Sequence, residues 1–113
     1  MKQCLGGLAF LILVISCERN HEPVVSQINY EPEQTSAGAI IELKVDASDE
    51  DGDLLDYSWN SSLGEFLSDT KLKEVSLKVP SDGEGKTVVI SVIVTDGEFE
   101  VIREANFELL APL

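Results

Sequence analysis

The feature of this sequence that most constrains its fold is the alternation of apolar and polar residues in short runs. Between positions 41 and 47 every second residue is apolar and the residues between are charged: Ile41, Leu43, Val45 and Ala47 against Glu42, Lys44 and Asp46. Successive side chains of a β-strand point to opposite faces, so this spacing predicts a strand with one face on a core and the other in water. Helical periodicity is absent after the first 17 residues, and we therefore expect an all-β domain.

Further runs of the same kind extend the prediction to a whole sandwich. Residues 87–95 are rich in β-branched side chains, and Val88, Ile90, Val92 and Val94 are predicted to share the core face. Residues 24–30, 55–60, 64–67, 75–79 and 99–110 complete a set of about seven strands, the number typical of an immunoglobulin-like antiparallel β-sandwich. The glycines of the Asp-Gly pairs 51–52, 82–83 and 96–97 are predicted to take positive φ in turns.

The first 16 residues have the pattern of a signal peptide. Lys2 supplies a positive start, residues 5–15 form an unbroken run of apolar residues and glycine, and Ser16 is a small residue suited to a processing site. A membrane-spanning helix is the alternative, but it needs about 20 apolar residues and this run is shorter.

The tetrapeptide Val14-Ile15-Ser16-Cys17 resembles the lipobox of bacterial lipoproteins. The resemblance implies cleavage before Cys17 and a diacylglycerol on its sulfur. The other cysteine, Cys4, lies in the predicted signal peptide, so no disulfide is expected in the mature domain. We thus expect a signal peptide at 1–16, a lipidated cysteine and tether at 17–23, and a sandwich domain at 24–113. The expected location is the bacterial cell envelope, at the outer membrane or cell surface, with a periplasmic face as the alternative.

The charge balance narrows the classes of partner. The chain has 8 Lys and Arg against 21 Asp and Glu, a net charge of -13. Such a field repels phosphate backbones, so no nucleic-acid partner is expected. It suits Ca²⁺ or a basic partner better.

Two segments resemble PKD-type domains. Residues 47–59, ASDEDGDLLDYSW, are similar to the segment that joins the second and third strands of that family, and residues 92–97, VIVTDG, to its late strand. Cadherin-like domains share the D-x-D-G-D-x-L-x-Y run, which favours the same sandwich. Where PKD domains usually carry W-D-F-G-D-G, residues 59–66 read WNSSLGEF. The resemblance implies a non-catalytic surface module that contacts protein or polysaccharide, or a spacer.

Acidic residues form the first candidate site. Asp49, Asp51 and Asp53 lie on one short loop, and Asp96 and Glu98 are expected at the same end of the sandwich. Clustered carboxylates suit Ca²⁺, although the spacing does not fit an EF-hand. The alternative is an Asp-rich turn that caps its own backbone N–H groups without metal.

The second candidate is a contact face at Val89 and Ile93, which are predicted to point outward from the central strand. Trp59 is predicted to pack in the core rather than to bind sugar. His21, the sole histidine, is expected to be part of the tether, and no enzymatic activity is expected. The expected function is a membrane-anchored binding module for protein or glycan. The alternative is a spacer or assembly subunit stiffened by Ca²⁺.

Overall fold

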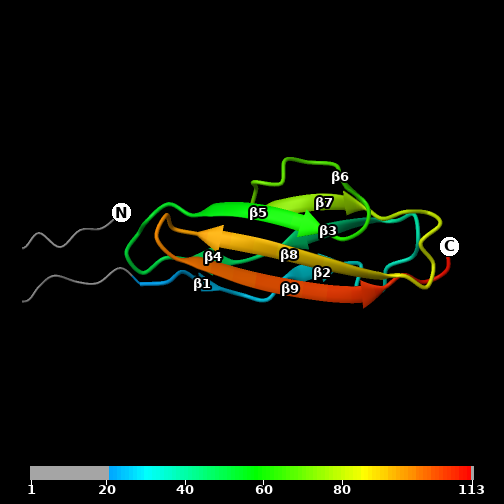
Figure 1. Ribbon diagram of the computed structural model, residues 1–113, viewed down its shortest axis with the longest axis horizontal. Coiled ribbons are helices and arrows are strands. Elements are labelled where there is room, and N and C mark those ends of the chain that lie inside the picture. The colour runs from blue at the N-terminus through cyan, green and yellow to red at the C-terminus, as the bar shows by residue number, and fades with distance from the viewer. Residues whose placement is uncertain (1–20, 113) are drawn as a thin grey trace, which may run out of the picture.

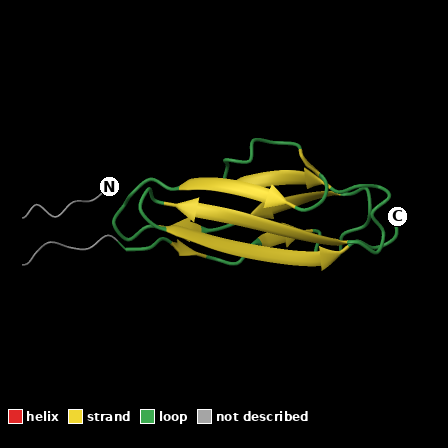
Figure 2. Ribbon diagram, viewed as in Figure 1, coloured by secondary structure: helices red, strands yellow, loops and turns green. Residues whose placement is uncertain are grey.

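The computed structural model describes residues 21–112, which form nine β-strands and no helix (Figures 1 and 2). This part of the chain therefore offers no helix with the length and hydrophobicity needed to cross a bilayer. The predicted signal peptide, Cys17 and most of the predicted tether lie outside the described residues.

Two antiparallel sheets make up the sandwich. The four-stranded sheet has the order β2-β3-β7-β6, and its strands are β2 (Asn29–Glu31), β3 (Ile40–Lys44), β7 (Glu74–Lys78) and β6 (Glu65–Phe66). The three-stranded sheet has the order β5-β8-β9, and its strands are β5 (Asp56–Ser61), β8 (Thr87–Thr95) and β9 (Glu100–Glu108). A short antiparallel pair, β1 (Val24–Val25) and β4 (Ala47–Ser48), continues the β2–β3 pair beyond the four-stranded sheet.

Two of the runs predicted as single strands are each interrupted. β1 and β2 are two parts of one run, and β3 and β4 are two parts of another. At the interruption the backbone N of Ser26 donates to the carbonyl O of Asp46 at 2.8 Å, and the Asp46 N donates to Ser26 Oγ at 3.0 Å. Treating each run as one strand leaves seven, arranged as the four-plus-three sheets of an immunoglobulin-like sandwich. The predicted fold class is confirmed.

The core lies between the two sheets and contains most of the residues that the alternation assigned to it, whereas Ala47 is only partly buried against it. Fully buried side chains come from β3, β7 and β8 and from the residues that directly follow β3 and β7: Ile41, Leu43, Val45, Leu77, Val79, Val88, Ile90, Val92 and Val94. Trp59 is 4% exposed, and its Nε1 donates a 2.8 Å hydrogen bond to the carbonyl O of Leu72. The Trp59 ring is therefore packed in the core, and its Nε1–H has a hydrogen-bond acceptor within the domain.

The turn prediction is correct for two Asp-Gly pairs and wrong for the third. Gly52 and Gly97 have φ of 74° and 97°, but Gly83 does not adopt positive φ. Gly83 is instead required by close packing, because a Cβ there would lie 2.8 Å from Leu109 Cδ1 and 3.1 Å from the carbonyl O of Pro80.

Candidate functional site

One end of the sandwich carries all five acidic residues predicted as ligands. The loop between β4 and β5, which holds Asp49, Asp51 and Asp53, lies at the same end as the turn between β8 and β9 (Figure 1). The described chain also begins at this end, while the C-terminus lies at the opposite end (Figure 1). The two loops therefore share one end of the sandwich, as predicted.

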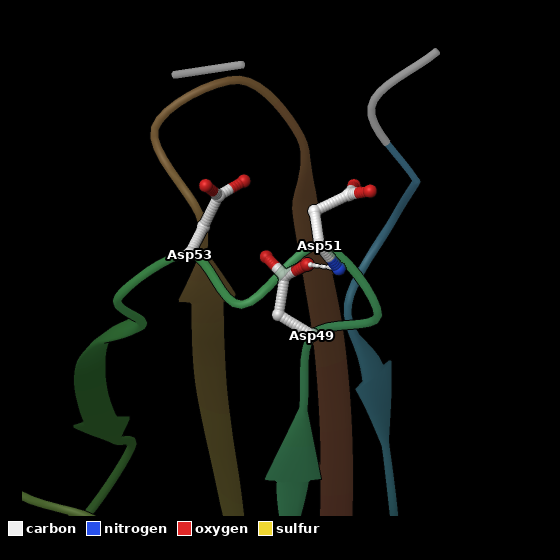
Figure 3. A group of neighbouring side chains, drawn as sticks. All are labelled: Asp49, Asp51 and Asp53. Atoms are coloured by element: carbon white, nitrogen blue, oxygen red, sulfur yellow. Dashed lines mark hydrogen bonds between the residues drawn. The ribbon is translucent and has the colours of Figure 1, made fainter. Parts of the chain in front are cut away.

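Asp49, Asp51 and Asp53 form a compact group on this loop. Each contributes a carboxylate oxygen, and these atoms all lie within 4.8 Å of one another (Figure 3). The loop is folded by its own turn: the Gly52 N donates to the Asp49 carbonyl O at 3.0 Å, and the Asp51 N donates to Asp49 Oδ1 at 2.8 Å. The self-capping turn is therefore present, and it holds the three carboxylates together.

Two carboxylate oxygens of this group take no part in the hydrogen bonds of the turn. Asp49 Oδ2 and Asp53 Oδ2 are buried and have no hydrogen-bond partner among residues 21–112. A buried polar atom without a partner costs about 1–3 kcal/mol, and more when it is charged. Because these oxygens belong to carboxylates that lie close together, a hard divalent cation is the ligand whose chemistry they fit.

Asp96 and Glu98 are not part of the three-carboxylate group in residues 21–112. Asp96 is only 8% exposed, and its Oδ1 accepts hydrogen bonds from the backbone N of Glu98 and of Phe99, both at 2.8 Å. Asp96 thus caps the turn between β8 and β9. Of the five residues predicted as ligands, the structure brings three together.

His21 contacts the same loop, a contact that the sequence analysis missed. Its backbone N donates to Asp51 Oδ2 at 2.7 Å, and its ring Nδ1 lies 3.4 Å from Asp51 Oδ1 and 3.5 Å from Glu50 Oε1. The Asp51 side chain is 5% exposed, against 65% for Glu50. Nothing in the sequence indicates a pairing across thirty residues, because it depends on where the first strand enters the fold.

The predicted contact face lies on the outer side of the three-stranded sheet. Val89 is 38% exposed, and Ile93 is half-buried on the same side of β8. Ile93 pairs directly with Ile102 of β9, which is 55% exposed. Ile102 was missed by the sequence analysis, although its position between Glu100 and Glu104 already indicated an outward-facing residue.

Carboxylates surround this apolar face. The exposed acids that share the outer side of β5 and β9 are Asp56, Glu100, Glu104 and Glu108. Neither Lys nor Arg occupies an outward position on these three strands, since Arg103 points toward β1, where its Nε donates to the Val25 carbonyl O at 3.2 Å. The outer face of the other sheet differs, because it carries Lys44 and Lys78 beside its acids.

Comparison with known proteins supports the fold. No protein-family model and no curated protein matches the chain. A solved structure, a nucleoside hydrolase-related hypothetical protein from Saccharophagus degradans that is associated with carbohydrate metabolism, is similar with a TM-score of 0.61 and 23% sequence identity. The similarity covers 82% of this chain and 26% of that one, so this chain spans about a quarter of its neighbour. At this identity the likeness concerns the fold alone.

Proposed function

We propose that this protein is a lipid-anchored, non-catalytic module that contacts a partner at the bacterial cell envelope. The observation that carries the proposal is the outer face of the β5-β8-β9 sheet, where Ile93 and Ile102 lie side by side and Val89 lies four residues from Ile93 along β8. Exposed apolar residues gathered on one sheet face, with polar residues around them, are typical of interaction sites.

The anchor and this face are compatible in space. Cys17, the proposed lipidated residue, precedes His21 by four residues, a stretch that spans at most about 14 Å when fully extended. His21 in turn contacts the acidic end of the domain. The lipid would therefore hold the acidic end near the membrane. Ile93 and Ile102, each two residues from the β8–β9 turn, would lie close to that end, and Val89 would lie further from the membrane along β8 (Figure 1).

The positions of the histidine and the two cysteines do not favour catalysis. His21 is the only histidine of the chain, and its ring lies against Asp51 and Glu50 at the end of the domain rather than in a cleft. Both cysteines precede position 18, and one of them is the proposed lipid attachment site. The hydrolase-related description belongs to a much longer protein, with which this chain shares the fold alone.

Paired double substitutions test the proposal. Val89→Lys with Ile93→Lys would place charge on the proposed face, and Ile40→Lys with Leu72→Lys would make the same change in charge at residues 49% and 48% exposed elsewhere. The full lipoprotein, purified in a nonionic detergent, would be used to recover partners from the envelope fraction. We expect a specific partner to be lost with the first variant and retained with the second. If the first variant recovers the same partners as the unmodified protein, the proposed contact face is wrong.

A second candidate function is that of a spacer stiffened by Ca²⁺, and the two orphaned oxygens Asp49 Oδ2 and Asp53 Oδ2 favour it. In that case Asp49, Asp51 and Asp53 would hold the ion, which would neutralise their mutual repulsion and make the loop rigid. Thermal melts with Ca²⁺ and with a chelator test this function, and identical midpoints at low salt would exclude it.

A further inference from the structure

We infer that the partner of the β5-β8-β9 face is a basic protein segment, in which an apolar side chain is flanked by Lys or Arg. The inference rests on the proposed contact function and specifies the chemistry of the partner at that face. It follows from the strand register, from the charges around the apolar residues and from the occupants that those charges exclude.

The register places Ile93 and Ile102 among the exposed acids of the same face, Asp56, Glu100, Glu104 and Glu108, which we call the acidic frame. Across the sheet, Ser58, Ile93 and Ile102 form one row of paired residues. The row on one side of it consists of Asp56, Thr95 and Glu100, and the row on the other side consists of Asn60, Ser91 and Glu104. Carboxylates therefore stand on both sides of the Ile93–Ile102 pair, within reach of a partner that covers it.

The charges of this frame are not neutralised within the domain. Asp56, Glu100, Glu104 and Glu108 are exposed, and none of them forms an ion pair with Lys or Arg in the part of the chain that the structure describes. The lysines that do pair with acids, Lys44 and Lys73, meet Asp46 instead. A partner that brings its own cations to the frame would supply the missing complementary charge.

Other occupants fit the face less well. A second copy of this chain would place the same unneutralised carboxylates against each other, and an anionic lipid surface would be repelled in the same way. A glycan is disfavoured because the aromatic rings of this sheet face inward: Trp59 and Tyr57 pair with the buried Val92 and Val94, and Phe107 stacks on Tyr30 at 5.0 Å. No aromatic platform is thus presented on the outer side of these strands.

Synthetic peptides test the inference with the full-length lipoprotein in nonionic detergent. The probe is a short peptide in which leucine is flanked by lysines, and two control peptides replace the lysines by glutamate or the leucine by serine. Binding is measured by fluorescence anisotropy, with empty micelles as the blank. We expect the lysine–leucine peptide to bind and both control peptides to bind much more weakly.

Matched variants distinguish this face from general charge attraction. Glu100→Gln with Glu104→Gln removes two charges from the frame, and Glu31→Gln with Glu65→Gln removes two exposed charges from the other sheet. We expect the first pair to weaken binding by at least about fivefold and the second to change it by less than about twofold. Equal weakening by both pairs, or failure of the lysine–leucine peptide to bind, would overturn the inference.

A third variant distinguishes an error in the partner's chemistry from an error in the proposed contact face. Ile93→Lys with Ile102→Lys is expected to abolish peptide binding while the far-UV circular dichroism stays that of a β-sandwich. If this variant instead abolishes binding of a neutral glycan from an array, the contact face stands and the basic partner is wrong. If it changes neither peptide binding, glycan binding nor partner recovery from the envelope, both the inference and the proposed contact face are wrong.

Discussion

The backbone N of His21 donates a 2.7 Å hydrogen bond to Oδ2 of Asp51, a residue thirty positions further along the chain. This contact joins the segment through which the chain enters the sandwich to the loop that gathers Asp49, Asp51 and Asp53. A hydrogen bond that ends on a carboxylate is stronger than one between neutral groups. The tether and the acidic loop are therefore structurally coupled, and the first prediction follows from this coupling.

Removal of the Asp51 carboxylate should release the segment around His21. We expect Asp51→Ala to increase the mobility of a nitroxide spin label placed at the exposed residue 22, measured by electron paramagnetic resonance. Glu50→Ala is the matched control, because its side chain is 65% exposed and approaches only the His21 ring, at 3.5 Å. Equal mobility in the unmodified protein and in Asp51→Ala would show that the hydrogen bond does not hold the segment.

Calcium should stabilise the domain through the three-carboxylate group. At a Ca²⁺ concentration about 100-fold above Kd, binding contributes roughly 2.7 kcal/mol, which corresponds to a rise in Tm of roughly 10–20 °C for a domain of this size. Differential scanning calorimetry in Ca²⁺ and in chelator measures the shift. Asp49→Asn with Asp53→Asn should remove it, whereas Asp82→Asn, at an exposed turn on the opposite end, should retain it. A shift that survives the double substitution would place the ion elsewhere.

Monovalent salt should also stabilise the domain in the absence of Ca²⁺. Without Lys2 and Arg19 the described residues keep 8 − 2 = 6 basic side chains, and without Glu18 they keep 21 − 1 = 20 acidic ones. This excess of negative charge produces self-repulsion, which added salt screens. We expect Tm in chelator to rise between low and high NaCl concentrations, and a fall in Tm would contradict this account of the charge.

Substitution of Trp59 should separate its packing from its hydrogen bond. Trp59→Ala is expected to destabilise the domain by about 3–5 kcal/mol, because it leaves a large cavity between the sheets. Trp59→Phe keeps most of the packing but removes the donor to the Leu72 carbonyl O, with an expected loss of about 1–3 kcal/mol. Urea unfolding followed by circular dichroism measures both losses.

Leu54→Ala is the control for this series, because Leu54 is 90% exposed and its truncation should change stability by less than about 0.5 kcal/mol. If Trp59→Phe proves as stable as the unmodified protein, the Nε1 hydrogen bond contributes nothing measurable. A Trp59→Ala variant with unchanged stability would contradict the buried position of the ring.

The strands and the core could be predicted from the sequence because side-chain direction in a strand is a local property. Every second residue faces the same way, so the apolar residues of 41–47 and 87–95 indicated both the strand and its buried side, and the position of Trp59 followed from the same rule. The loops that share one end of the sandwich were likewise predicted, because the order of strands in such a fold determines which loops meet.

Tertiary structure alone decided which side chains meet. The pairing of Ile93 with Ile102 depends on the register between β8 and β9, and the contact of His21 with Asp51 depends on the path of the entering chain. The same holds for Gly83, whose close neighbour Leu109 lies far along the sequence. Such contacts join residues distant in sequence, and the alternation within one strand carries no information about them.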